Sequence, residues 1–312
     1  MSFLETQRQK AIGLRDDMFK DPGGGVFKKL ERDFVLKDPA LNIWEGVRED
    51  AIAFFNRNNI PFWDSGNEPT GHLLSSQIAC INHLYPVRQR HDIATAILQS
   101  VDKKVKFALR MDNGVPESGY VDFEVIGAKN YLGEKQHTRG ANSTSVDAVM
   151  LAEMENGQRK LFFIEWKYVE QYKSQPSKAE GTSGQTRIKI YLPLLEQGDC
   201  PFRITNVEGL FTEPYYQLMR QTLLANEMVK AKEYHADDYM HLHLIPTENT
   251  DLKNVNTAAG KLEGTNLNDT WKNLLKSPDK YKAVDPKDFI SAAKKCEDTL
   301  AWTTYLQNRY WA

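Results

Sequence analysis

The chain has few cysteines and no long hydrophobic run. Its three cysteines, Cys80, Cys200 and Cys296, lie far apart, which is typical of reduced thiols and not of a disulfide framework or a zinc site. No segment approaches the roughly 20 apolar residues of a membrane span, so we expect no membrane attachment. Residues 1–20 lack the apolar core and small-residue cleavage site of a secretory signal. We therefore expect a cytoplasmic protein.

Several common catalytic motifs are also missing. The glycines at 23–25 are not followed by Gly-Lys-Ser/Thr, so they do not form a phosphate-binding loop. No Gly-x-Ser-x-Gly elbow and no dinucleotide-binding fingerprint occur. His241 and His243 alternate along an expected strand at 239–245, but no third metal ligand is near them in the sequence. We interpret them as an ordinary exposed strand face.

The net charge is close to zero. Lys and Arg number 40 and Asp and Glu number 42, giving −2 and a sequence pI near 6.4. A dedicated non-specific nucleic-acid binder is normally basic, so any contact with nucleic acid should be local. Residues 88–110 are locally basic and could follow a phosphate backbone, although a solvated helix end would have the same composition.

Length and periodicity predict one large α/β domain. The 312 residues are 41% hydrophobic, which is ordinary for a globular protein, and no internal repeat is visible. We expect a core at about 73–248, with helical extensions at 1–72 and 249–312. The expected helices span 45–58, 73–85, 88–101, 215–232 and 289–311, and the expected strands span 120–126, 146–153, 160–169 and 239–245.

The strongest local signal in the sequence is a β-hairpin. Two runs with strand character, 146–153 and 160–169, flank the tripeptide Glu-Asn-Gly at 155–157. Asn-Gly between such runs is typical of a hairpin turn. The sequence therefore predicts that these two strands pair with each other in an antiparallel manner.

The length of the turn decides which side chains meet across the hairpin. A two-residue turn would place Asp147 opposite Trp166, which puts Glu165 and Lys167 on the other face. A three-residue loop with Gly157 in the left-handed conformation places Asp147 opposite Glu165 instead. We predict the three-residue loop, because it gathers two carboxylates and one ammonium group on a single face.

Such a face suits a divalent cation. Two carboxylates about 4 Å apart repel by roughly 4 kcal/mol at an effective dielectric constant near 20. A bound cation relieves this repulsion, and Mg²⁺ prefers one or two carboxylates together with a phosphate substrate. Lys167 could contact the same phosphate or position an attacking water.

This arrangement resembles the PD-(D/E)XK nuclease superfamily, an uncharacterised restriction-endonuclease-like branch of it. The match consists of Asp147 and then Glu165-Trp166-Lys167 on the next strand, with Val146 where the family name has proline. Further similar blocks extend the resemblance from about residue 75 to about residue 248: Ser75-Ser76-Gln77 with Asn82, residues 140–147, residues 167–170, and residues 217–225.

The resemblance implies a restriction-endonuclease-like fold and function. The fold would be a mixed central sheet flanked by helices, with helical additions at both ends. The activity would be Mg²⁺- or Mn²⁺-dependent hydrolysis of phosphodiester bonds in DNA, with a homodimer as a possible assembly. The catalytic residues would be Asp147, Glu165 and Lys167, and the metal would also contact the Trp166 backbone carbonyl.

Other residues are candidates for supporting roles. Glu124 is a candidate third carboxylate, because strand parity places it on the same side as Asp122. Four residues are candidates for substrate binding: Gln77 and Arg139, and, on one face of the expected helix at 215–232, Gln217 and Arg220. Gln221 shares that face by its spacing along the helix. Arg220 could equally pair with the acids of the site from behind.

Two alternatives use the same residues. In the first, the chain is a catalytically inactive nuclease-fold module that binds nucleic acid or a protein partner. In the second, Asp147, Glu165 and Lys167 form an ordinary cross-strand ion pair on a solvated sheet, which contributes about 0.2–1 kcal/mol. Metal affinity that depends on the carboxylates would separate the nuclease from both.

Overall fold

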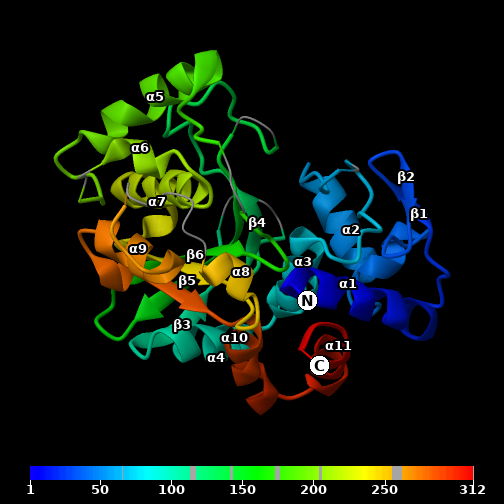
Figure 1. Ribbon diagram of the computed structural model, residues 1–312. Helices are drawn as coiled ribbons and strands as arrows, with labels where there is room; N and C mark the ends of the chain where they lie inside the picture. The colour runs from blue at the N-terminus through cyan, green and yellow to red at the C-terminus, as the bar shows by residue number, and fades with distance from the viewer. Residues whose placement is uncertain are drawn as a thin grey trace.

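A mixed β-sheet of six strands runs through the middle of the protein (Figure 1). The computed structural model describes residues 1–311 apart from 65, 113–116, 141–142, 173–175, 204–205 and 255–261. The strands are β1 (Gly25–Phe27), β2 (Leu30–Arg32), β3 (Val105–Leu109), β4 (Asp122–Val125), β5 (Val146–Met154), β6 (Arg159–Trp166), β7 (Asp238–Leu244) and β8 (Tyr281–Val284). The helices are α1 (Phe3–Leu14), α2 (Arg48–Arg57), α3 (Ser76–Leu84), α4 (His91–Val101), α5 (Gly181–Leu195), α6 (Val207–Leu210), α7 (Tyr215–Lys230), α8 (Thr250–Lys253), α9 (Leu267–Leu274), α10 (Pro286–Ser291) and α11 (Leu300–Leu306).

Strand β5 is an interior strand of the large sheet, with β3 and β4 on one side and β6 on the other. One side of β5 pairs with β4 near its start and with β3 near its end, both antiparallel. Its other side pairs with β6 in the antiparallel hairpin, and β7 and β8 continue from β6 in parallel. The predicted α/β class with a mixed central sheet flanked by helices is therefore confirmed.

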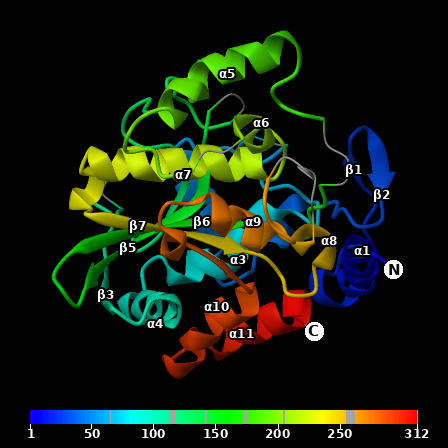
Figure 2. The same ribbon diagram turned by 60° about the vertical axis from the view of Figure 1, so that its left-hand side comes forward.

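Helices cover both faces of this sheet, and the side chains of β5 alternate between them. Ala148 and Met150 pack in the cluster that contains residues of α3 and α4. Val149 and Leu151 pack in the cluster that contains residues of α7 and α9. Figure 2 shows α7 over one face and α4 with α10 over the other. Burial of both faces explains why the strands read as near-continuous apolar runs.

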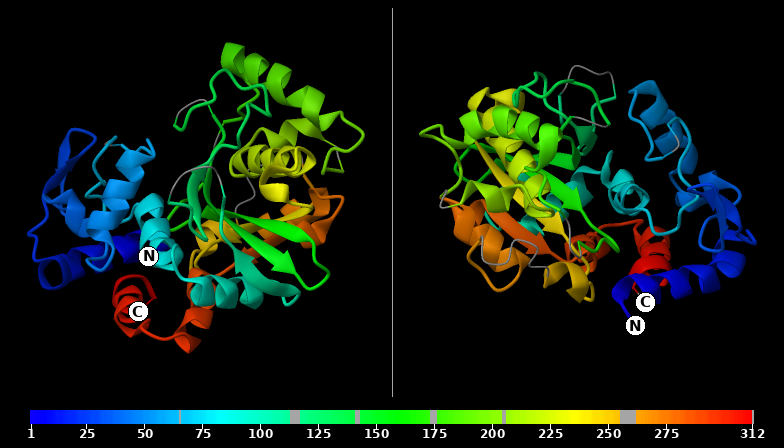
Figure 3. Two further views of the ribbon diagram at one scale, coloured as in Figure 1. Left: turned by 180° about the vertical axis from the view of Figure 1, so that it is seen from behind. Right: turned by 45° about the horizontal axis from the view of Figure 1, so that its top comes forward.

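The two ends of the chain meet beside α3. Asn82 on α3 accepts a hydrogen bond from the Trp44 amide at 2.8 Å and donates to the Asn42 carbonyl at 3.0 Å and the Tyr310 hydroxyl at 2.9 Å. Arg309 donates to the same Asn42 carbonyl at 2.6 Å. Figure 3 shows the two termini lying close together. Asn82 therefore joins both extensions to the core, because a buried amide needs all its partners.

Several local predictions differ from the structure. Strand β3 and strand β8 were not expected from the sequence, and β8 adds a parallel strand from a segment expected to be only helical and looped. The expected final helix at 289–311 is divided between α10 and α11. Among the described residues, no helix has the length and apolar character needed to cross a membrane.

The prediction that His241 and His243 face solvent is wrong. Both are buried, at 1% and 0% exposure, because α7 covers the face of β7 from which they project. Alternation of apolar and polar residues normally marks a half-exposed strand. Here the polar positions are filled by imidazoles whose Nδ1 atoms lie 3.1 Å from the hydroxyl groups of Thr222 and Tyr281.

Candidate active site

The hairpin has the predicted three-residue loop. Gly157 is left-handed, with φ 80°, and its amide donates to the Met154 carbonyl at 2.9 Å. The strand pairing runs from Glu153 opposite Arg159 to Ala148 opposite Ile164. The next position in this register pairs Asp147 with Glu165, so the predicted register is confirmed. The Trp166 amide donates to Asp147 Oδ2 at 2.7 Å, which fixes the Asp147 carboxylate beside β6.

A third carboxylate lies in the same row. Strand β4 pairs with β5 such that Phe123 is opposite Ala148 and Val125 is opposite Val146, which places Glu124 opposite Asp147. Glu124, Asp147 and Glu165 therefore occupy matching positions on three adjacent strands. We call these three residues the acidic row.

His243 follows the acidic row on the next strand. In the parallel pairing of β6 with β7, Glu165 is the partner of His243. Burial lowers the pKa of His243 well below its usual range, and the Lys167 ammonium lowers it further. The imidazole is therefore neutral beside the site, and its Nε2 atom is buried without a hydrogen-bond partner. Sequence reasoning missed this residue, because the register between parallel strands cannot be read from the chain.

Glu165 and Lys167 form a buried ion pair. Their side chains are 1% and 7% exposed, and Lys167 Nζ lies 2.5 Å from Glu165 Oε1. Lys167 also donates to Gln217 Oε1 at 2.8 Å. Burial opposes the charged form of Lys167, but the Glu165 carboxylate offsets this and the pKa of Lys167 is raised. Lys167 therefore remains an ammonium ion.

Helix α7 supplies two amides to the site. Gln217 accepts from Lys167 as described above, and Gln221, one turn later, donates to Glu165 Oε2 and to the Ser145 carbonyl. The remaining oxygen of Gln221, Oε1, is buried without a hydrogen-bond partner. The structure thus brings Gln217 and Gln221 to the site, as the spacing along the helix predicted.

Arg220 points elsewhere. Its guanidinium lies over the Tyr216 ring at 4.8 Å and 3.9 Å from Glu134 Oε1. Glu134 also accepts from the Thr144 amide at 2.6 Å and the Tyr191 hydroxyl at 2.5 Å. Among the described residues, Arg220 forms its ion pair with this carboxylate and not with the acidic row. The expectation that it pairs with the acids of the site from behind is therefore wrong.

Glu124 reaches the row from an unusual backbone conformation. Its φ is 47°, a left-handed value that is uncommon for a residue with a side chain. Gln77 of α3 donates to its Oε1 and Ser145 donates to its Oε2, both at 2.9 Å. Strand parity predicted that Asp122 and Glu124 face the same side of the strand. The left-handed residue interrupts the alternation of β4, so the two side chains have different neighbours. Asp122 instead lies near Tyr234, whose pKa is raised by burial and by the Asp122 carboxylate.

Arg139 lies on the outer side of Glu124. Its Nε donates to the Glu124 backbone carbonyl at 2.9 Å, and its Nη1 donates to the Asn58 carbonyl at 3.3 Å. These two contacts hold the guanidinium beside the acidic row. Both are with backbone carbonyls, and neither is with a carboxylate of the row. By contrast, Arg88 from the locally basic segment is buried, 3.8 Å from the Phe54 ring.

The electrostatics of the row favour proton uptake or cation binding. Burial raises the pKa of Asp147 well above its usual 3.8, and the neighbouring Glu165 and Glu124 carboxylates raise it further. Burial also raises the pKa of Glu124. Three carboxylates and the single ammonium of Lys167 would leave a net charge of −2 when all are ionised. A divalent cation has the opposite charge, and carboxylate oxygens are its preferred ligands.

The side chains of the row do not form a ready-made metal-binding group. Among the described residues, no three His, Cys, Asp or Glu side chains are grouped closely enough to hold a metal ion. Each carboxylate of the row instead has a protein partner. The chemistry of the donor set fits a hard divalent cation, and the unpartnered Gln221 Oε1 adds a further buried oxygen.

We expect the contribution of Asp147 to the stability of the metal-free protein to decrease as the pH rises. The folded state binds the Asp147 proton more tightly than the unfolded state, because the pKa is raised on folding. This stabilisation is fully present below the unfolded pKa of about 3.9 and is lost as the pH rises through the folded value. Thermal unfolding in EDTA across this range should show a smaller decrease for Asp147→Asn than for the wild type. An identical decrease in both proteins would contradict the shift.

The mixed sheet, whose acidic row is contacted by Gln77 of α3 and Gln221 of α7, gives the protein a restriction-endonuclease-like core. A family model described as "Restriction Endonuclease associating with ARP" matches residues 14–311, so the chain belongs to that family. No curated protein and no solved structure matches the chain.

Proposed function

We propose that the protein is a Mg²⁺-dependent nuclease of the PD-(D/E)XK type that hydrolyses phosphodiester bonds in DNA. The observation that carries the proposal is the strand register, which assembles Glu124, Asp147 and Glu165 from three strands with Lys167 beside them. Membership of a restriction-endonuclease family supports it. Mn²⁺ should substitute for Mg²⁺, because both prefer oxygen ligands in octahedral geometry.

Asp147, Glu165 and the Trp166 carbonyl would hold the ion, with Glu124 as a further ligand. When bound, the ion supplies a Lewis acid for the scissile phosphate and lowers the pKa of a bound water. Asp147 is already positioned by the Trp166 amide, and Glu165 by Gln221. These contacts would keep both carboxylates near β6 while the ion is exchanged.

Lys167 would act as a cation and not as a general base. Its raised pKa keeps the ammonium protonated at neutral pH, so it cannot accept a proton from water. Gln217 holds the ammonium at 2.8 Å, and the charge would stabilise the negative charge that develops on the phosphate. Gln77, Arg139, Gln217 and Arg220 remain proposed substrate contacts. In the structure Gln77 donates to Glu124, and Arg220 is engaged with Glu134.

One observation favours the alternative of an inactive nuclease-fold module. The described residues contain no ready chelating group, and Lys167 already pairs with Glu165. Such a module would bind nucleic acid or a protein partner without requiring the ion. For the nuclease we propose a cytoplasmic location and a homodimeric assembly. Both proposals would apply to the module as well.

Metal binding and cleavage together distinguish these functions. The purified protein is titrated with Mg²⁺ and Mn²⁺ by calorimetry and then incubated with single-stranded and duplex DNA and RNA. The nuclease should bind the ion and cleave DNA, and EDTA should abolish the cleavage. The absence of both metal binding and cleavage across all substrates would rule out the nuclease and leave the binding module.

A further inference from the structure

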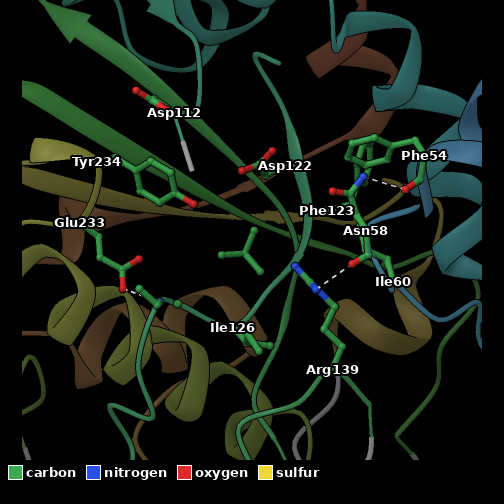
Figure 4. Close-up of a pocket in the computed structure, with 13 residues that line it drawn as sticks. Phe54, Asn58, Ile60, Asp112, Asp122, Phe123, Ile126, Arg139, Glu233 and Tyr234 are labelled. Atoms are coloured by element: carbon green, nitrogen blue, oxygen red, sulfur yellow. Dashed lines mark hydrogen bonds between the residues drawn. The ribbon is translucent and has the colours of Figure 1, made fainter. Parts of the chain in front are cut away.

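A cavity of about 470 Å³ lies on the other side of β4 from the acidic row. Its walls come from β4 and the residues that follow it, from the end of α2 and the residues after it, and from the turn at residues 233–234, with Asp112 and Arg139 from two further segments (Figure 4). The volume is within the range of small-molecule sites, which is about 300–1,000 Å³. No step of the proposed cleavage mechanism uses this cavity.

The cavity combines apolar walls with a few polar groups. The apolar part is formed by Phe54, Ile60, Phe123, Val125 and Ile126. The polar part is formed by Asp112, Asp122, Asn58, Arg139, Glu233 and Tyr234. Apolar and aromatic walls with a small number of placed polar groups are typical of a site for a flat organic ligand.

Tyr234 is held in the cavity by a strained turn. Lys232, Tyr234 and His235 all have left-handed backbones, with φ of 58°, 52° and 55°. Each such residue costs about 1–2 kcal/mol relative to the right-handed conformation. Strain of this kind is retained where the surrounding structure needs a particular side-chain position. Here it directs the Tyr234 hydroxyl into the cavity, on the side of Asp122 (Figure 4).

The cavity is one residue away from the acidic row. Asp122, Phe123 and Val125 line it, whereas the carboxylate of Glu124 between them is bonded to Gln77 and Ser145. The left-handed backbone of Glu124 produces this division. Arg139 belongs to both regions, because it lines the cavity and donates to the Glu124 carbonyl. A ligand in the cavity would therefore be adjacent to a phosphate at the row.

The charges in the cavity define the ligand further. Three carboxylates, Asp112, Asp122 and Glu233, line it together with one guanidinium, that of Arg139. This excess of negative charge disfavours a phosphate inside the cavity and favours groups that donate hydrogen bonds. Arg139, on the side of the acidic row, suits a phosphate at the entrance. A nucleobase attached to a backbone phosphate has this distribution of groups.

We infer that the cavity receives one unpaired nucleobase of the nucleic-acid strand that is cleaved at the acidic row. This inference rests on the proposed nuclease function. The base would lie against the apolar walls, as bases do when an enzyme removes them from the stack. Its donor edge would meet the Asp122 carboxylate, because a carboxylate can accept several hydrogen bonds at once.

Guanine is the base that fits this edge best. Its N1–H and its exocyclic amine are adjacent donors, which a carboxylate accepts together. Thymine presents a single N–H between two carbonyl oxygens, and those oxygens would meet the negative charge of Asp122. A good two-bond contact gives a discrimination of about tenfold or more.

Binding without cleavage tests the inference. Single-stranded oligonucleotides of thymine with one central guanine, or with thymine throughout, are titrated with the full-length protein in EDTA and followed by fluorescence anisotropy. The guanine oligonucleotide should bind about tenfold more tightly. Tyr234→Phe, which removes only the hydroxyl, and Asp122→Asn should each reduce the preference to less than about threefold.

Two variants serve as matched controls. Tyr131→Phe alters a tyrosine whose pKa is raised by burial and by the nearby Glu233, and which does not line the cavity. Asp237→Asn alters an exposed aspartate that pairs with Lys232 on the same turn. Both should retain the preference of the wild type. The Tyr234 variant keeps the ring, so it provides the result even if Asp122→Asn does not fold.

The outcomes separate this inference from the proposed function. Equal binding of the two oligonucleotides, no binding of either, or a preference that survives both substitutions overturns the base site. Metal-dependent cleavage accompanied by equal binding would leave the nuclease in place without the base site. A guanine preference that depends on Tyr234 and Asp122, without any cleavage, would support the base site and exclude the nuclease.

Discussion

Asp147→Asn should reduce DNA cleavage about a thousandfold without unfolding the protein. A metal ion contributes several kcal/mol to stabilising a phosphoryl transition state, and each 1.36 kcal/mol corresponds to a factor of ten in rate. Asparagine has nearly the same shape as aspartate, and its side-chain oxygen can still accept from the Trp166 amide. The change therefore removes charge from the acidic row and leaves the local packing in place.

The same substitution should not destabilise the metal-free protein at neutral pH. In the wild type, Asp147 is buried beside two other carboxylates, which is why its pKa is raised. Removal of its charge relieves this repulsion. The expected combination is thus lost cleavage and lost Mg²⁺ affinity with an unchanged or higher melting temperature. A variant that loses activity only because it fails to fold would show a lower melting temperature.

Glu153→Gln is the matched control for this experiment. Glu153 lies on the same strand, six residues further on, and pairs with Lys106 at 2.9 Å near the surface. An exposed pair of this type contributes about 0–1 kcal/mol. Its removal should therefore leave cleavage and metal affinity unchanged. The assignment of the active site would be contradicted if Asp147→Asn, free of contaminating nuclease, still cleaved DNA at the wild-type rate.

The sequence predicted the centre of the site because the determining interactions there are local. The turn at 155–157 connects adjacent strands, so its loop length alone sets Asp147 opposite Glu165. Helical spacing likewise predicted that Gln217 and Gln221 share a face of α7. Both inferences depend on a few neighbouring residues and on geometry that is the same in all proteins.

The parts that were missed depend on contacts between distant segments. Glu124 was predicted as a candidate third carboxylate, but from strand parity with Asp122. It joins the row instead through a left-handed backbone, which strand periodicity does not predict for glutamate. His243 becomes a neighbour of Glu165 only through parallel pairing with β6, across more than 70 intervening residues. Its burial depends on α7, which lies over that face. Periodicity reports which residues share a face, but it does not report what covers the face.

Lys167→Met should destabilise the protein by about 3–5 kcal/mol in addition to removing cleavage. The Lys167 ammonium is the cationic partner of the Glu165 carboxylate, and both are almost fully buried. Removal of one member of a buried pair leaves the other charge without compensation, which typically costs that amount. In the variant, Glu165 must remain buried and charged, or take up a proton. Proton uptake requires less free energy at lower pH, so the destabilisation should decrease as the pH falls.

A second substitution isolates the contribution of the charge. In Glu165→Gln/Lys167→Met, no isolated charge remains at this position, and an amide can still bond Gln221. The double variant should regain most of the stability that Lys167→Met loses, as measured by urea unfolding, while cleavage remains absent in both. A double variant no more stable than Lys167→Met would mean that packing of the lysine side chain, and not its charge, stabilises this part of the protein.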